Sequence, residues 1–101
     1  MQIIEMPIFT KYVYDHLSED GYKELQEYLV RHPSMGDVIP KTGGLRKLRW
    51  ATAQKGKRGG LRIIYYWVTD DEEMIMVYLY AKSDQDDLTR EQYRRLLEGL
   101  K

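Results

Sequence analysis

The chain has 101 residues, a formal net charge of zero and no cysteine. This length suits one domain with a modest core, and without cysteine neither disulfides nor a cysteine-ligated zinc ion can hold that domain together. No run comes near the roughly 20 apolar residues that cross a membrane, and the N-terminus lacks the apolar core of an export signal, so we expect a cytoplasmic protein with no membrane contact and no metal or other cofactor.

The first third of the sequence predicts a short strand and a helical hairpin. Residues 2–5 favour a strand, which Pro7 limits to a short or edge position. Apolar residues then recur every four positions, as on one face of a helix: Phe9, Val13 and Leu17. Ser18 is a typical N-cap for a second helix, and that helix is expected to end at His32, before Pro33.

The middle of the sequence predicts an antiparallel meander. Residues 32–44 are dense in turn-forming residues and are expected to form an ordered connection. After them the apolar period changes to two, and three segments are rich in β-branched and aromatic residues: 45–52, 61–68 and 73–82. The acidic run at 69–72 is typical of a hairpin turn. These strands are apolar on both faces, so we expect each face of the sheet to be covered at least in part.

The last segment predicts a helix that closes the domain. Thr89 and Gln92 have the spacing of a capping box, and a helical stripe of apolar residues follows: Tyr93, Leu96, Leu97 and Leu100. The predicted order is β-α-α-β-β-β-α in a single domain of residues 1–101. This is an α+β fold with an antiparallel sheet, the helical hairpin on one face of that sheet, and a C-terminal helix.

Charge is distributed unevenly along this neutral chain. Residues 1–40 carry a net charge of −4, residues 41–69 carry +8 without a single acid, and residues 70–101 carry −4. Like charges placed close together repel, so a wholly basic central segment indicates a binding surface for an anion.

The densest basic stretch is KGKRGGLR at residues 55–62, and most of it falls on the predicted loop AQKGKRGG, residues 53–60, between the first two strands of the meander. Its glycines permit positive φ angles and expose backbone N–H groups, while its lysines and arginines suit phosphate. It is not a P-loop, which requires GxxxxGK followed by serine or threonine between a strand and a helix. The alternative is a solvated turn that is basic by chance. We favour a binding surface, because further cations lie in the neighbouring strands: Arg46, Lys47, Arg49, Arg62 and Lys82.

Aromatic residues and histidines give weaker signals. Nine tyrosines and two tryptophans are plentiful for this length, and bases of single-stranded RNA stack on such rings. Burial in the core gives a comparable gain, so we expect at most one or two of them to face a ligand. His16 and His32 belong to the predicted helical hairpin, and we interpret them as ordinary surface or helix-end residues.

Three stretches resemble the HigB-type branch of the RelE/ParE toxin superfamily: GDVIPKTGGLRKLR at 36–49, GKRGGLRIIYY at 56–66 and YAKSDQDDL at 80–88. These proteins are the toxic halves of bacterial type II toxin–antitoxin operons. The resemblance implies a fold like that of small microbial ribonucleases and an endoribonuclease that cuts mRNA in the ribosomal A site. It also implies, as partners, the ribosome, mRNA and a cognate helix-turn-helix antitoxin, with operator DNA bound only indirectly through the antitoxin.

The resemblance further implies roles for individual side chains. RNA cleavage by the 2′-OH needs a proton acceptor, charge stabilisation at phosphorus and a proton for the leaving 5′-oxygen. By matching motif positions, Lys55 and Lys57 are candidates for proton transfer or phosphate contact. Arg62 is the candidate for stabilising the pentavalent phosphate, and Lys82 for assisting the leaving group or clamping the RNA backbone. Four more residues are expected to contact RNA, the tyrosine by stacking on a base: Arg46, Arg49, Arg58 and Tyr80.

The chain departs from the family pattern at one place. Several relatives carry a tyrosine or histidine shortly after the position of Lys82, where this chain has Ser83, Asp84 and Gln85. Such an incomplete acid–base set would act weakly on free RNA, so we expect cleavage to depend on the ribosome, which positions the mRNA. Two alternatives remain open: a gyrase poison of the ParE type without nuclease activity, and a noncatalytic RNA-binding module.

Overall fold

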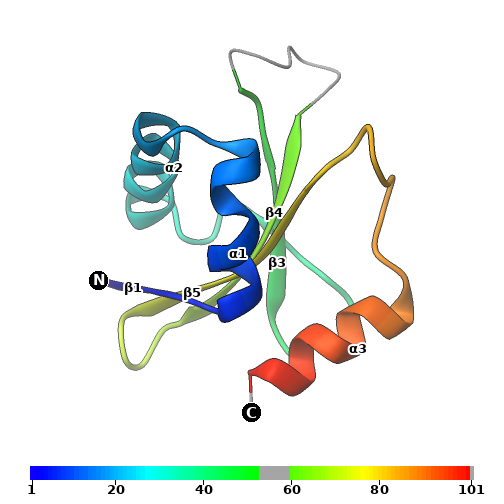
Figure 1. The fold of residues 1–101 in the computed structure, drawn as a ribbon. Coiled ribbons are helices and arrows are strands. Elements are labelled where there is room, and N and C mark those ends of the chain that lie inside the picture. The colour runs from blue at the N-terminus through cyan, green and yellow to red at the C-terminus, as the bar shows by residue number, and fades with distance from the viewer. Residues whose placement is uncertain (53–59, 101) are drawn as a thin grey trace.

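The computed structural model describes residues 1–52 and 60–100, which form one sheet with helices on both of its faces (Figure 1). In chain order, the elements are β1 (Gln2–Glu5), α1 (Pro7–His16), α2 (Glu19–Arg31), β2 (Asp37–Val38), β3 (Leu45–Trp50), β4 (Leu61–Val68), β5 (Glu73–Ala81) and α3 (Arg90–Gly99). No helix among these residues is long and apolar enough to cross a membrane.

The sheet has the strand order β1-β5-β4-β3-β2. The predicted meander is confirmed, because β3, β4 and β5 pair antiparallel in sequence order. Two details differ from the prediction. A two-residue strand, β2, lies within the predicted connection and pairs with β3, and β1 runs parallel to β5, so the sheet is mixed rather than wholly antiparallel. No short hairpin joins β1 to β5, and their relative direction is therefore not constrained by a tight turn.

Each face of the sheet carries its own apolar core, as expected for strands that are apolar on both faces. On one face α1 and α2 pack their buried stripes, represented by Phe9, Val13 and Leu25, against the sheet. On the other face α3 and the segment before it contribute Leu88 and Leu96. The predicted helical hairpin on one face and the C-terminal helix are both confirmed.

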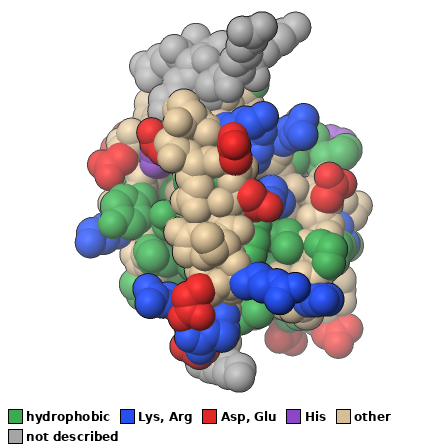
Figure 2. Space-filling model, turned by 90° about the vertical axis from the view of Figure 1, so that its right-hand side faces the viewer, with side chains coloured by type: hydrophobic (Ala, Val, Ile, Leu, Met, Phe, Trp, Pro, Cys, Tyr) green, Lys and Arg blue, Asp and Glu red, His purple; other side chains and the backbone are tan. Residues whose placement is uncertain are grey.

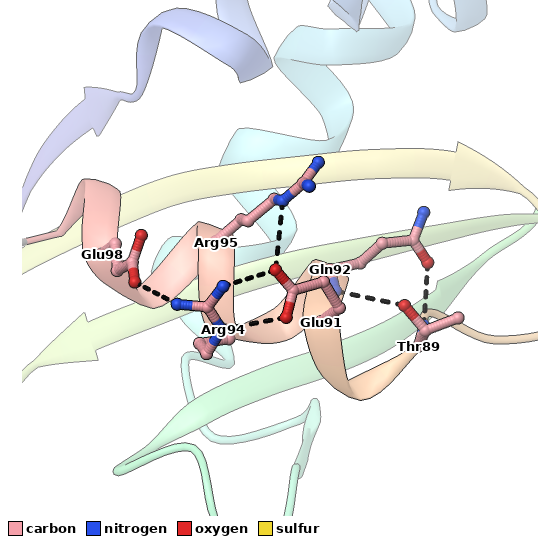
Figure 3. A network of polar contacts seen from close by, with 6 residues as sticks. All are labelled: Thr89, Glu91, Gln92, Arg94, Arg95 and Glu98. Atoms are coloured by element: carbon pink, nitrogen blue, oxygen red, sulfur yellow. Dashed lines mark hydrogen bonds and ion pairs between the residues drawn. The ribbon is translucent and has the colours of Figure 1, made fainter.

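The helices begin and end where the sequence places their caps. The side chain of Ser18 accepts a hydrogen bond from the backbone N–H of Gly21 at 3.0 Å, and α2 ends with His32 as its C-cap. At α3 the capping box is complete: the N–H of Gln92 donates to Thr89 Oγ1 at 3.1 Å, and the N–H of Thr89 donates to Gln92 Oε1 at 2.8 Å (Figure 3). Two of the otherwise free N–H groups at the start of α3 are thereby satisfied.

A β-bulge in β5 decides which residues face α3. Tyr65 pairs with Met76 while its neighbour Ile64 pairs with Tyr78, so Val77 is the extra residue. An extra residue shifts every later side chain of the strand to the other face. Tyr80 consequently lies on the α3 face, whereas an unbroken alternation would place it on the α1 face with Met76.

Candidate functional site

A row of polar residues crosses three strands on the α3 face of the sheet. Arg49 of β3 stands opposite Arg62 of β4, and Arg62 stands opposite Tyr80 of β5. Residues in direct register have their Cβ atoms about 5 Å apart, and like charges placed this way destabilise a sheet. The two arginines therefore concentrate positive charge at a point where the fold gains nothing from it, which is typical of a site for an anion.

This row borders a cavity of about 380 Å³ near the ends of β3, β4 and β5. Lys82 follows β5, and its backbone N–H donates to the carbonyl oxygen of Gly60 at 3.2 Å, which ties the end of β5 to the start of β4. We call this cavity the cation pocket. Its charged lining residues are Lys47, Arg49, Arg62, Lys82, Asp37, Asp86 and Asp87. Three of the predicted site residues, Arg49, Arg62 and Lys82, are thus brought to one place.

The guanidinium of Arg62 is the most enclosed cation of the pocket. The residue is 8% exposed, and among the described residues its side chain makes one long hydrogen bond, from Nη1 to the carbonyl oxygen of Leu61 at 3.4 Å. A guanidinium carries five N–H donors, and a buried charge is normally paired. Most of the donors of Arg62 are therefore available to an anionic ligand within the described structure.

A carboxylate closes one side of the cation pocket. Asp87 Oδ1 accepts hydrogen bonds from Lys47 Nζ at 2.6 Å, from the hydroxyl of Tyr93 at 2.7 Å and from the N–H of Leu88 at 2.8 Å. Partial burial raises the pKa of Asp87, but the hydrogen bonds from Lys47, Tyr93 and Leu88 outweigh it and hold that pKa below its ordinary value. We call this arrangement the Asp87 clip. It fixes Lys47 of β3 to the start of α3.

Tyr80 pairs with Arg62 in the sheet but is not among the residues that line the pocket. Its side chain is buried, at 4% exposure, and its hydroxyl has no hydrogen-bond partner among the described residues. Burial raises the pKa of Tyr80. The expected stacking of this ring on a base does not agree with its burial, because a stacking ring must offer one open face to its base.

Arg46 does not join the other cations. It lies on the α1 face of the sheet, where its Nη1 donates to the carbonyl oxygens of Ser34 at 3.1 Å and Gly36 at 2.8 Å, and its guanidinium lies over the ring of Trp67 at 6.0 Å. Arg46 and Arg49 are three residues apart in β3 and therefore point to opposite faces of the sheet, so the structure does not bring Arg46, a predicted RNA contact, to the pocket. In this structure Arg46 braces the segment that precedes β2.

Three predicted site residues, Lys55, Lys57 and Arg58, lie at 53–59, outside the described residues. Four charged residues of the pocket were not predicted as site residues: Lys47, Asp37, Asp86 and Asp87. Lys47 carried a usable signal, since it is two residues from Arg49 in a strand and hence on the same face. The acids carried none, because they come from segments far from the basic stretch in sequence.

The chemistry of the cation pocket suits a phosphate rather than a metal ion. Guanidinium and ammonium groups from adjoining strands bind phosphate oxygens and stabilise charge that develops on them. The carboxylates supply groups that accept protons. Among the described residues, no group of three or more His, Cys, Asp or Glu side chains is arranged to hold a metal ion.

Comparison with known proteins points to the same region of the chain. The family model described as the RelE toxin of the RelE/RelB toxin–antitoxin system matches residues 34–99. The matched range contains all the lining residues of the cation pocket. The fold is similar to that of an arginine-to-alanine double mutant of the E. coli toxin RelE in the free state, with a TM-score of 0.59, 11% sequence identity, and coverage of 84% of this chain and 86% of that chain.

Proposed function

Because the chain belongs to the RelE family of toxins from toxin–antitoxin systems, we propose that it is a ribosome-dependent endoribonuclease that inhibits translation by cutting mRNA in the A site. The observation that carries the proposal is the convergence of Arg62 and Lys82, from neighbouring strands, on one cavity with Arg49. The scissile phosphodiester in that cavity would meet Arg62 and Lys82, with Arg49 beside them. The match of three sequence stretches to the HigB-type branch supports placing the chain in that branch.

The proposed reaction is attack of a ribose 2′-OH on the adjacent phosphorus, with release of the 5′-oxygen. The enclosed guanidinium of Arg62 stabilises the charge that develops on the phosphorane oxygens, since it lines a partly desolvated site and has donors to spare among the described residues. Lys82 donates a proton to the leaving oxygen or holds it by a charged hydrogen bond. Lys47 and Arg49 contact the neighbouring backbone.

Lysines and carboxylates are the candidates for the proton acceptor in the proposed mechanism. Lys55 and Lys57 keep the role that the family resemblance implies, since a lysine crowded by other cations loses proton affinity. Asp37 and Asp86 also line the cavity and bring carboxylates within the same volume. Because none of these is a histidine of ordinary pKa near neutrality, the acid–base set is weak. Orientation of the mRNA by the ribosome then supplies much of the barrier reduction, on the order of 7–11 kcal/mol in well-aligned cases.

The proposed partners follow from the family. A toxin of a RelE/RelB type system has a cognate antitoxin. We propose that this antitoxin carries a helix-turn-helix domain, neutralises the toxin by covering or distorting the cation pocket, and alone contacts operator DNA in the complex.

The experiment compares cleavage of one mRNA, as naked RNA and on programmed ribosomes, by the wild type, Lys82→Gln and Arg31→Gln. Arg31 ends α2 on the other side of the sheet and is exposed, so it is the matched control. We expect cleavage on ribosomes only, reduced in Lys82→Gln and unchanged in Arg31→Gln. Equal rates on naked RNA would contradict ribosome dependence. Ribosome binding without any cleavage by the wild type would favour the noncatalytic module.

A further inference from the structure

A second groove adjoins the cation pocket. It has a volume of about 330 Å³ and lies between the turn that follows β2 and the first turns of α3. Its lining residues are Pro40, Lys41, Thr42, Arg90, Tyr93, Arg94 and Leu97. The groove shares Pro40 with the cation pocket, and the Asp87 clip links the two, since Tyr93 of the groove holds the carboxylate that pairs with Lys47.

The groove offers two cations that no acid neutralises within the described residues. Arg94 is engaged, because it pairs with Glu91 and Glu98 on its own helix (Figure 3). Lys41 and Arg90 form no ion pair with any described residue, and both are exposed at the edges of the groove. On the face that carries α3, basic side chains lie in the upper part of the view and again lower down, with acidic side chains among them (Figure 2). Positive charge therefore extends beyond the cation pocket.

The turn that holds Lys41 is built by internal hydrogen bonds. Thr42 Oγ1 donates to the carbonyl oxygen of Ile39 at 2.7 Å and accepts from the N–H of Leu45 at 3.1 Å. Lys41 itself has a φ of 64°, in the left-handed region that a non-glycine residue rarely adopts. The backbone of the turn thus fixes where the stem of Lys41 begins, opposite the helix that carries Arg90.

The floor of the groove is apolar and aromatic. Pro40 and Leu97 supply aliphatic surface, and the ring of Tyr93 is half-buried, with Lys47 Nζ 5.7 Å from its centre. An aromatic or apolar floor beside cations is the combination that binds single-stranded nucleic acid, in which bases contact the floor and phosphates contact the cations. A purely electrostatic surface would not need such a floor.

We propose that this groove is a subsite for the nucleotide adjacent to the scissile linkage, with its phosphate between Lys41 and Arg90 and its base or sugar against Tyr93. The inference rests on the proposed function, because it continues the same RNA strand out of the cation pocket. The N-terminus of α3 is not invoked as the anion site, because its capping box engages the N–H groups of Thr89 and Gln92. The two side chains supply it instead.

The test uses uncleavable RNA analogues with a 2′-deoxy sugar at the scissile position, starting from a dinucleotide and extended one nucleotide at a time on either side. Dissociation constants are measured by fluorescence anisotropy at several salt concentrations. For the wild type, extension on one side should tighten binding and add about 0.7 to the magnitude of the salt slope for the added phosphate contact. In Lys41→Gln/Arg90→Gln, this gain in affinity from the short to the extended analogue should be lost.

The matched control is Arg31→Gln/Arg95→Gln, which removes two exposed arginines outside the groove and should keep the wild-type gain on extension. If Lys41→Gln/Arg90→Gln also keeps that gain, the subsite is wrong while the cation pocket stands. If the wild type binds the dinucleotide no better than Arg62→Gln does, the cation pocket itself is not a phosphate site. The proposed function then fails, and the subsite fails with it.

Discussion

Arg49 and Arg62 stand directly opposite each other on adjacent antiparallel strands, and both line the cation pocket. Sheet stability alone would favour an opposite charge or an apolar residue at either position. The pairing of two arginines is explained if both of them bind an anion, which offsets their mutual repulsion. A bound anion would then stabilise the protein, because it binds the folded chain and not the unfolded one.

Replacement of Arg49 by glutamine should therefore stabilise the free protein while weakening its binding to RNA. Removal of one of two facing like charges is expected to raise the free energy of unfolding by about 0.2–1 kcal/mol, measured by urea denaturation at low salt. The gain should shrink at high salt, because screening weakens the repulsion in the wild type. Arg31→Gln, remote from the pocket, is the control. A loss of stability in Arg49→Gln would show that the arginines are already compensated.

Replacement of Arg62 by lysine should separate binding from catalysis. Lysine keeps the positive charge but lacks the planar fork that contacts two phosphate oxygens at once. We expect the single-turnover cleavage rate on programmed ribosomes to fall by about 10²–10³, as when one donor to a transition-state oxyanion is lost. Ribosome binding should change far less, and Arg31→Lys should behave as the wild type. A rate within a few-fold of the wild type would remove Arg62 from the catalytic group.

The Asp87 clip predicts a pH-dependent contribution to stability. The pKa of Asp87 is lower in the folded protein than in the unfolded chain. The ionised carboxylate therefore contributes fully to the free energy of unfolding above the unfolded-state pKa of about 4, and this contribution is lost as the pH falls through the folded-state pKa. At neutral pH, Asp87→Asn should lower the free energy of unfolding by up to about 1 kcal/mol, since the carboxylate is partly exposed and screened.

Urea titrations of the wild type and Asp87→Asn across the acid range check this expectation. The difference between the two proteins should disappear in strong acid, where the wild-type carboxyl is protonated. Asp86→Asn is the control, because Asp86 lines the same pocket without an ion pair among the described residues. A difference that keeps its full size in strong acid would mean that the Asn side chain perturbs packing rather than charge.

The sequence predicted the helices and central strands of this fold better than the arrangement of the two edge strands of the sheet. Caps such as Ser18 and Thr89 act within a few residues, so their effect is local and visible in the chain. The pairing of β1 with β5 joins segments that are far apart in sequence, and β2 is too short to show a period. Neither leaves a local pattern from which it could be predicted.

The candidate site was predictable to the extent that strand alternation holds. In β3, alternation alone separates Arg46 from Arg49 and adds Lys47 to the pocket. In β5, alternation fails at Val77, where the bulge turns Tyr80 to the other face, and nothing in the local sequence marks that residue. Among the acids of the pocket, Asp37 lies in β2, and Asp86 and Asp87 lie in the segment before α3. Only the tertiary structure brings these segments together.

Replacement of Tyr80 by phenylalanine should stabilise the protein. The Tyr80 hydroxyl is buried without a partner among the described residues, and such a group costs about 1–3 kcal/mol. Tyr65→Phe is the matched control with the opposite sign, because that hydroxyl accepts from the N–H of Gly36 at 2.8 Å and donates to the carbonyl oxygen of Pro33 at 2.7 Å. Urea denaturation should therefore show a higher free energy of unfolding for Tyr80→Phe and a lower one for Tyr65→Phe. If both variants lose stability, the Tyr80 hydroxyl has a hydrogen-bond partner in the folded protein.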